Sequence, residues 1–201
     1  MPTRTLGNGE CRGKRLTGGV GSLTSHFMTL RSILIHPDPR LKKACAAVDT
    51  VDDDMRRLID DMLETMYDAP GVGLAAPQIG ALQRLFVMDC AEKDASPEPL
   101  ALINPEIMWA SEEMRAHEEG CLSIPDIYEN VTRPDRVRMR WLDREGARCE
   151  GEFDGLAATC AQHEIDHLDG KLFIDHLSMM KRQMITGKMK KLKRERAKQI
   201  S

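Results

Sequence analysis

The sequence lacks the long apolar runs that membrane proteins need. No stretch approaches the roughly 18 consecutive apolar residues of a membrane-spanning helix, and the mean hydropathy is -0.41. The 15 glycines and 10 prolines in 201 residues are too few for a collagen-like chain, and the middle of the chain is too periodic for a wholly disordered one. No internal repeat is present either. These absences leave a globular protein with the size of one ordinary domain, and we expect no membrane partner.

Cysteine pairs and a secretory leader are also missing. The six cysteines, at positions 11, 45, 90, 121, 149 and 160, include no Cys-x-x-Cys pair, and no signal-peptide hydrophobic region precedes them. This usage predicts a reducing, intracellular compartment, in which a cysteine is a small core residue, a ligand or a nucleophile. We therefore expect a cytoplasmic location.

The first 27 residues differ in composition from the rest of the chain. They contain six glycines, show no apolar period, and are followed by a second methionine, Met28. An acid-poor, arginine-bearing start is typical of an organellar transit peptide, which would place the protein in an organellar matrix, but the glycines oppose the amphipathic helix of such a peptide. This composition favours translation from Met28. We predict a disordered extension at 1–27 and a single domain at 28–201.

Charge is segregated along the chain. The formal net charge is -3, yet residues 181–201 hold nine basic side chains and one acidic one, a net +8, and residues 28–180 hold a net -14. A basic C-terminal helix is predicted over 177–199. One side of this helix is expected to hold Met180, Met184, Ile185, Met189 and Leu192.

Helical and strand periods alternate in the body of the chain. A helix is predicted over 50–68, where Thr50 to Asp53 form a capping box, and Ala69-Pro70-Gly71 ends it. Short strands are predicted at 85–88 and 100–103. A hairpin is predicted from 136 to about 153, because Val137, Met139 and Trp141 alternate with arginines before a turn at 143–146. A further helix is predicted over 156–168, with Asp154 as its cap.

The most informative segment is Gln162-His163-Glu164-Ile165-Asp166-His167. Its two histidines are separated by four residues, so on a helix both imidazoles project from one face and can bind one metal ion. Glu164 then lies beside that ion. The alternative, a helix with two hydrogen-bonded but otherwise inert histidines, would leave two buried imidazoles in need of partners.

A catalytic zinc-type site usually takes a third protein ligand. The metzincin pattern would put a histidine where Phe173 stands, which excludes that class. The thermolysin pattern would need a downstream glutamate, and Glu195 lies between arginines in the basic tail. His176 is possible but belongs to a different segment. Cys160 and Cys121 remain, and Cys160 is awkward because three ligands would spread over about 10 Å of one helix.

Three motifs in this order resemble the peptide deformylase family, whose members remove the formyl group from the N-terminal formylmethionine of nascent proteins. They are Gly71-Val72-Gly73-Leu74-Ala75-Ala76-Pro77-Gln78, Glu119-Gly120-Cys121-Leu122-Ser123 and Gln162-His163-Glu164-Ile165-Asp166-His167. The similarity extends from about Ile33 through Met180. It implies an α+β fold in which short, mostly antiparallel sheets surround a central metal-binding helix, with N-terminal and C-terminal helices outside.

The resemblance assigns the metal ligands to Cys121, His163 and His167. It implies one divalent ion per chain, Fe(II) in the cell, which is often exchanged for Zn, Ni or Co in purified protein; thiolate and imidazole ligands suit all four. A metal held in this way lowers the pKa of a bound water, so that a nucleophile for the formyl carbon exists near neutral pH.

The resemblance also assigns the residues that act on the substrate. Glu164 is the implied general acid and base, and the Gln78 side chain and the Leu122 backbone N–H are the implied oxyanion donors. The substrate-binding residues implied are Val72, Gly73 and Cys160, where glycine permits close approach of an extended peptide.

Two other function classes remain open at this point. A zinc peptidase could use the same helix, and cleavage of formyl-peptides rather than peptide bonds would separate it from a deformylase. An inactive ribosome-binding or metal-storing relative would more readily have lost Glu164 or Gln78. We expect a monomer that acts on N-formylmethionyl peptides, binds no DNA, and contacts the ribosome through the basic helix at 177–199 by salt-dependent phosphate contacts.

Overall fold

The computed structural model describes residues 29–92 and 95–200, and the extension predicted at 1–27 lies outside the described residues. The α-helices of the described residues are α1 (Asp53–Asp68), α2 (Gly155–Leu168) and α3 (Met179–Ile200). Their strands are β1 (Gly73–Ala75), β2 (Leu85–Met88), β3 (Leu100–Ala110), β4 (Met114–Cys121), β5 (Ile124–Pro134), β6 (Arg136–Leu142) and β7 (Arg148–Asp154). All strand pairs within the sheets are antiparallel.

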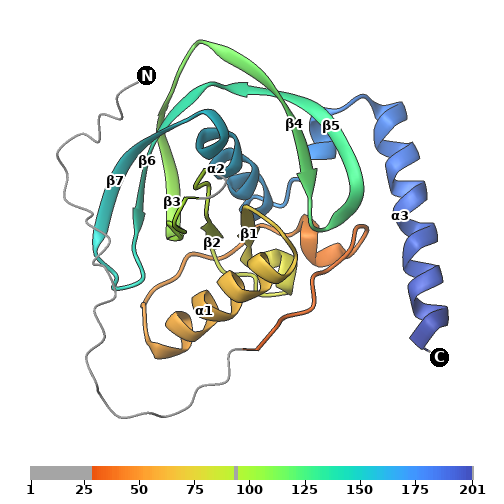
Figure 1. Ribbon diagram of the computed structural model, residues 1–201, viewed down its shortest axis with the longest axis horizontal. Coiled ribbons are helices and arrows are strands. Elements are labelled where there is room, and N and C mark those ends of the chain that lie inside the picture. Colours follow the sequence, from red (N-terminus) through yellow and green to blue (C-terminus); the bar gives the residue numbers. More distant parts are fainter. Residues whose placement is uncertain (1–28, 93–94, 201) are drawn as a thin grey trace.

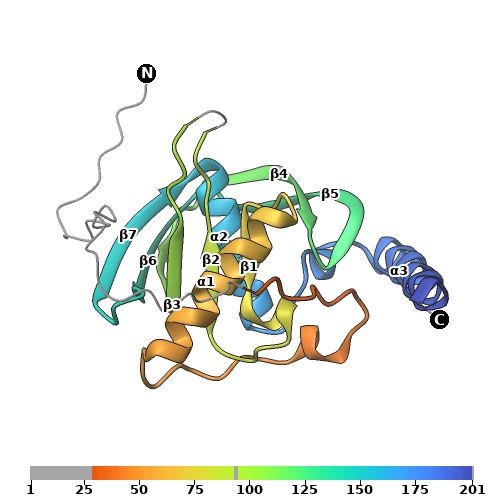
Figure 2. The same ribbon diagram turned by 60° about the horizontal axis from the view of Figure 1, so that its bottom comes forward.

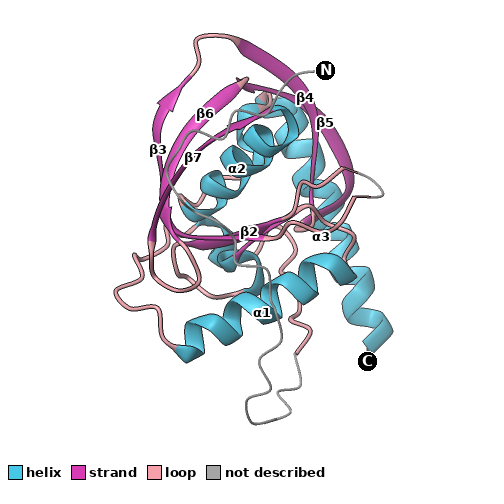
Figure 3. Ribbon diagram, turned by 60° about the vertical axis from the view of Figure 1, so that its left-hand side comes forward, coloured by secondary structure: helices cyan, strands magenta, loops and turns pink. Residues whose placement is uncertain are grey.

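The strands curve around α2 (Figures 1 and 3). The larger sheet has the strand order β1-β2-β3-β6-β7, and β4 and β5 form a separate two-stranded sheet. In Figure 3 the two sheets lie on opposite sides of α2, and α1 lies outside the strands. This arrangement confirms the predicted α+β fold with a central helix.

Helix α2 is enclosed because its apolar residues meet the inner face of the larger sheet. Ala158, Ala161 and Leu168 are fully buried and share one core cluster with sheet residues such as Phe86 and Val137. Burial removes most of α2 from water, so its polar residues need partners inside the protein. The helix begins as predicted after Asp154, although that side chain forms no capping hydrogen bond within the described part of the chain.

The predicted hairpin is strands β6 and β7. Val137 and Met139 are fully buried, while the alternating arginines of β6 are exposed and face acidic partners such as Glu106 and Glu150. Trp141 packs on Phe153 with ring centroids 5.6 Å apart. The period of two in the sequence therefore separates a core face from a charged face.

Helix α1 starts later than predicted. The expected start at residue 50 is wrong, because Thr50 to Asp52 precede the helix and Asp52 is the cap. The carboxylate of Asp52 accepts a hydrogen bond from the Met55 backbone N–H at 2.9 Å. An aspartate can cap the free N–H groups of a first turn as well as a threonine can. Met55, Ile59, Met62 and Met66 are buried in the core cluster between α1 and the strands, as their spacing predicts.

Helix α3 projects from one side of the molecule (Figures 1 and 2). Ile185 and Met189 pack into the core cluster near β5, and Leu192 borders it. The prediction that Met180 and Met184 share this side is wrong, since they are 81% and 52% exposed. No helix within residues 29–92 and 95–200 is long and apolar enough to cross a membrane.

Candidate metal centre and active site

The two histidines of the central segment face one another on α2. The rings of His163 and His167 meet edge to face with centroids 5.0 Å apart, and both residues are buried. A spacing of four residues on a 14-residue helix produces this alignment. Both imidazoles therefore project from the same face of α2, as their spacing predicts.

Cys121, the last residue of β4, completes a trio with these histidines. Its Sγ lies 3.2 Å from His167 Nε2, and the nearest ligand atoms of all three residues lie within 4.8 Å of one another. Within the described residues this is the one group of three such side chains that could hold a metal ion. The structure thus brings together the sulfur and the two imidazoles that the resemblance assigns as metal ligands.

A second layer of charged residues orients His163. Its Nδ1 donates to Glu119 Oε2 at 2.8 Å, and Glu119 forms a two-pronged ion pair with Arg133 at 2.6 and 3.0 Å. Burial would raise the pKa of Glu119, but the hydrogen bonds from His163 and Arg133 outweigh it and hold that pKa at about 2. An ionised partner on Nδ1 leaves Nε2 for the ligand position, as in most metal-binding histidines.

The alternative third ligands lie elsewhere. His176 donates through Nε2 to Asp166 at 2.7 Å, and Asp166 also accepts from Arg133 at 2.8 Å. Glu195 is on α3 with its carboxylate 3.9 Å from Lys191. Phe173 stacks on His163 with centroids 6.1 Å apart. None of these three side chains joins the Cys121 trio, which is defined over the described residues.

Glu164 lies next to the trio and has no polar partner for one oxygen. The residue is 4% exposed, and its Oε2 is buried without a hydrogen-bond partner in the described part of the chain. Burial raises the pKa of Glu164 to about 7. A Cβ built on Gly73 would lie 2.5 Å from Glu164 Oε1, so glycine is required where β1 passes this carboxylate.

Gln78 presents its amide nitrogen to Cys121. The Gln78 Oε1 accepts from the Ala75 backbone N–H at 2.7 Å, which fixes the amide orientation. Its Nε2 donates to Ser123 Oγ at 3.2 Å and lies 3.5 Å from Cys121 Sγ. Leu122 directly follows Cys121, and its side chain packs with the α1 core cluster.

The three expected substrate residues meet at β1. Gly73 begins β1, which is the edge strand of the larger sheet, and Val72 precedes it with 46% of its surface exposed. The Val72 carbonyl accepts from the Cys160 thiol at 3.6 Å. An edge strand can pair with an extended peptide. Cys160 is therefore beneath this strand and does not belong to the metal-ligand trio.

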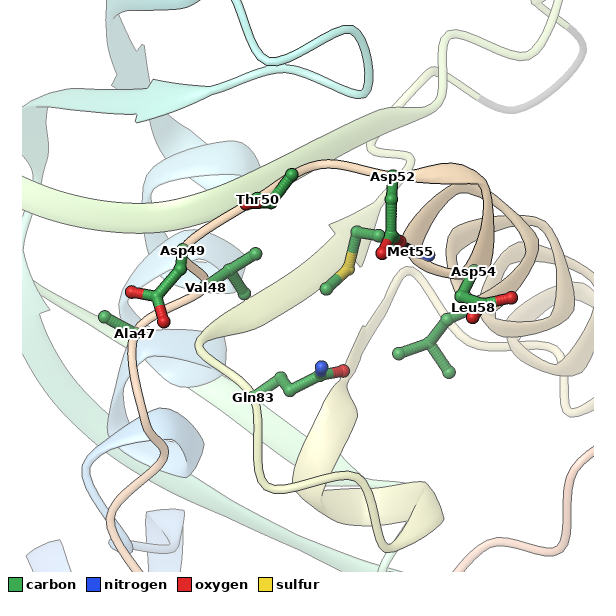
Figure 4. A pocket seen from close by; sticks show the side chains of 9 residues that line it. All are labelled: Ala47, Val48, Asp49, Thr50, Asp52, Asp54, Met55, Leu58 and Gln83. Carbon is green, nitrogen blue, oxygen red and sulfur yellow. Dashed lines mark hydrogen bonds between the residues drawn. The ribbon is translucent and has the colours of Figure 1, made fainter.

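A hollow of about 490 Å³ lies at the start of α1 (Figure 4), and no residue of the trio lines it. Its walls include the carboxylates of Asp49, Asp52 and Asp54, and Gln83 faces them from the other side. Asp52 is committed to the helix cap. The chemistry-bearing groups of α2 are not among the residues that line this hollow.

Sequence reasoning missed the second layer around His163. Glu119 lies inside a motif that the sequence identifies, and a carboxylate partner for a ligating histidine is a general expectation that could have found it. Arg133 gives no such signal. It reaches Glu119 only because β4 pairs with β5, 14 residues away in sequence.

Known proteins with this arrangement are deformylases. The family model for polypeptide deformylase matches residues 30–183. Peptide deformylases of Alkalilimnicola ehrlichii and Methylocella silvestris are 58% and 56% identical, over 84% and 82% of this chain and 93% and 85% of their own. The crystal structure of peptide deformylase from Ehrlichia chaffeensis superposes with a TM-score of 0.80 at 39% identity, covering 84% of this chain and 99% of that one. The chain therefore belongs to the polypeptide deformylase family of enzymes.

Proposed function

We propose that the chain removes the formyl group from the N-terminal formylmethionine of nascent polypeptides, releasing formate and a free amino terminus, with a divalent metal ion on Cys121, His163 and His167. The family to which it belongs acts on nascent peptides in this way. The observation that carries the proposal is the close trio of ligand atoms beside a buried carboxylate, Glu164, with an unpartnered oxygen among the described residues.

The donor set fits a divalent transition metal. One thiolate and two imidazoles suit Fe, Zn, Co or Ni, and the Glu119 carboxylate on His163 Nδ1 is the second-layer contact that ligating histidines usually make. We propose Fe(II) in the cell, and Zn, Ni or Co in purified protein. When bound, such an ion supplies Lewis-acid polarisation and activates water near neutral pH.

The protein's own residues hold and move the proton. Glu164 takes a proton from the attacking water and returns it to the leaving amine. Gln78 Nε2 and the Leu122 backbone N–H donate to the formyl oxygen as negative charge develops there, and one such donor is worth about 3 to 4 kcal/mol. Gln78 suits this role because its other amide atom is already held by Ala75. The edge of β1 at Val72 and Gly73 aligns the substrate as an added strand, above Cys160.

Replacement of Glu164 tests this assignment. We expect Glu164→Gln to retain one metal ion per chain, because the residue is no ligand, and to lose at least about a hundredfold in kcat, because the proton acceptor is gone. Metal content by mass spectrometry and hydrolysis of a formyl-Met peptide are the measurements. Glu150→Gln, on the exposed face of β7, is the matched control and should keep wild-type kcat. Near-normal turnover of Glu164→Gln would contradict the mechanism.

The pH profile gives an independent test of Glu164. Burial raises its pKa from the ordinary 4.5 to about 7, and a bound cation lowers it again. The ionised form is the active base, so kcat/KM should rise with pH through a midpoint between these two values. If the residual activity of Glu164→Gln still rose with pH through the same midpoint, the group that titrates there would not be Glu164.

Substrate choice separates the deformylase from a peptidase. We expect cleavage of formyl-Met-Ala-Ser and no cleavage of acetyl-Met-Ala-Ser or of internal peptide bonds, because Val72 and Gly73 at the edge strand hold the peptide so that its formyl end meets Glu164. Hydrolysis of an internal bond would favour the zinc peptidase. Tight metal binding with no hydrolysis of any substrate would favour an inactive relative.

We also propose a monomer that works in the cytoplasm beside the ribosome, with the basic helix α3 as the contact. Lys190, Lys193 and Arg194 line one hollow together with Pro37. This grouping of cations on one part of α3 suits RNA phosphates, whose binding weakens steeply as salt rises.

A further inference from the structure

Two free thiols, Cys90 and Cys160, lie together beneath the edge strand β1. Cys160 is buried on α2, and Cys90 follows β2 by two residues and borders the same core cluster. The two thiols are close enough that each shifts the pKa of the other. Neither thiol belongs to the Cys121 trio.

Rigid elements hold the two thiols in place. The Val72 carbonyl accepts from the Asp89 backbone N–H at 2.9 Å and from the Cys160 thiol at 3.6 Å. The residue before Cys90 and the side chain of Cys160 are therefore fixed to the same peptide group. The contact links α2 to the end of β2 across 70 residues of sequence.

We propose that Cys90 and Cys160 are a modification site for peroxides, at which oxidation forms a reversible disulfide. The Cys90 sulfur attacks one peroxide oxygen, an S–O bond forms, the O–O bond breaks, and the first water leaves. The Cys160 sulfur then attacks the Cys90 sulfur, the S–S bond forms, the S–O bond breaks, and the second water leaves. Two electrons pass from the two thiols to one hydrogen peroxide.

The surroundings favour Cys90 as the first nucleophile. Cys90 is partly exposed, whereas Cys160 is 6% exposed, so peroxide reaches Cys90 first. Interaction with the Cys160 thiol lowers the pKa of Cys90 in spite of its burial, and the thiolate is the reactive form. Cys160 is then positioned as the resolving thiol.

The disulfide would act on the substrate strand, and this consequence rests on the proposed function. An S–S bond is about 2.05 Å long, so the two sulfurs must approach one another, and Cys160 loses the thiol proton that it donates to the Val72 carbonyl. A Cβ on Gly73 would lie 2.7 Å from Cys160 Sγ, which shows how closely β1 packs on this sulfur. We expect formyl-peptide hydrolysis to fall about ten- to a hundredfold in the oxidised enzyme, because small displacements of a bound substrate cost this much.

Peptide mapping of the full chain tests the bond directly. The zinc-loaded enzyme, which holds no redox-active metal, is fully reduced, treated with hydrogen peroxide, and cleaved with trypsin and a glutamate-specific protease. Glu150 and Glu152 place Cys149 in a different fragment from Cys160. We expect a Cys90 fragment linked to a Cys160 fragment, about 2 Da lighter than the two thiol fragments together, and separated again by dithiothreitol.

Two variants sharpen the result. Cys90→Ser should form no such link and should keep its hydrolysis after peroxide, while Cys45→Ser, which removes another partly buried free thiol, should behave as wild type. The peptide map of the wild type could overturn the proposal without any variant. It would do so if Cys90 and Cys160 were both fully alkylated after peroxide and oxygen were added at Cys121 instead. A link that leaves hydrolysis unchanged would overturn the effect on β1. A reduced enzyme that hydrolysed no formyl-peptide would contradict the proposed function. The peptide map would still show whether the disulfide forms.

Discussion

Gln78 and Glu164 are both buried polar side chains next to Cys121, yet their hydrogen bonds differ. Both amide atoms of Gln78 have partners, so its nitrogen is oriented before a substrate arrives. Glu164 keeps one oxygen without a partner among the described residues, and burial holds its pKa near neutrality. A fixed donor needs no reorganisation as charge develops, and a proton carrier needs an open oxygen. The environment of each residue therefore matches the role proposed for it.

A substitution at Gly73 should damage this part of the site. The added Cβ of Gly73→Ala would lie 2.5 Å from Glu164 Oε1 and 2.7 Å from Cys160 Sγ. We expect kcat/KM for a formyl-peptide to fall at least about tenfold, and the free energy of unfolding to fall by about 1 to 3 kcal/mol from overpacking. Gly187→Ala in α3 is the control: its Cβ meets nothing within 4 Å, and alanine should stabilise that helix by about 0.5 to 1 kcal/mol. An active, stable Gly73→Ala enzyme would refute the close approach.

The third ligand can be identified by comparing two cysteines. We expect Cys121→Ser to lose stoichiometric metal and activity and to shift residual binding toward harder ions, because the softest ligand is removed. Cys160→Ser should retain its metal, since its sulfur contacts Val72 and lies outside the trio. Metal content after dialysis is the measurement. Metal loss from Cys160→Ser with retention in Cys121→Ser would overturn the assignment.

Elements differ in how far the sequence predicts them. The β6–β7 hairpin follows from an apolar period of 2, since it has one buried face. Helix α2 is buried nearly all round, and it follows from its composition and from the signals at its two ends. Strand β4 shows one buried residue in eight, and β5 alternates only in part, because a two-stranded sheet leaves most of both faces in water. Strand β1 is only three residues long, and its pairing with β2 decides its conformation. These three strands could not be derived from local patterns.

The same limit applies to the site. The trio and Glu164 are found from sequence because each belongs to a short motif with chemical meaning. The ion pair of Arg133 with Glu119 depends on the register of β4 against β5, which no local pattern specifies. Motifs thus predict the side chains that come together as candidate ligands, and the tertiary fold determines the groups that orient them.

This ion pair should also make the β4–β5 sheet sensitive to acid. Removal of one partner from a buried pair costs about 3 to 5 kcal/mol, so we expect that loss for Glu119→Gln at pH 7 in urea unfolding. The pKa of Glu119 is held at about 2 against an ordinary 4.5. Its stabilisation is therefore complete above pH 4.5 and is lost as pH falls toward 2.

The wild type and Glu119→Gln should consequently converge in stability as pH falls from about 5 toward 2. Glu150→Gln, which removes an exposed partner of Arg138, should change stability by less than about 1 kcal/mol at any pH. If the difference in free energy of unfolding between wild type and Glu119→Gln did not depend on pH, Glu119 would act through packing and not through its charge.

Across the whole molecule, an acidic body bears a basic helix at one side. Both apolar and polar contacts hold α3 against the body. Ile185 and Met189 are buried, and His36 Nε2 lies 3.0 Å from Thr186 Oγ1. Lys181 bridges to Glu129 of β5 at 2.6 Å. These contacts fix the first half of α3, so the cations farther along the helix are presented at a fixed place relative to the body.

Because Met189 belongs to the core, removing residues 188–201 would disturb packing as well as charge, and neutralisation is the sharper test of the ribosome contact. We expect the triple variant Lys190→Gln, Lys193→Gln and Arg194→Gln to hydrolyse a short formyl-peptide at the wild-type rate, since the reacting groups are on α2, β4 and η2 (Ala76–Ile79). Its co-sedimentation with ribosomes at low salt should weaken at least about tenfold, and the salt dependence of binding should become shallower, because fewer phosphates are neutralised.

The control replaces Arg136, Arg138 and Arg140 of the exposed β6 face by Gln, which makes the same change in net charge at another place. Equal weakening by both triples would mean that net charge alone draws the enzyme to the ribosome, and wild-type sedimentation of the α3 triple would exclude α3 as the contact.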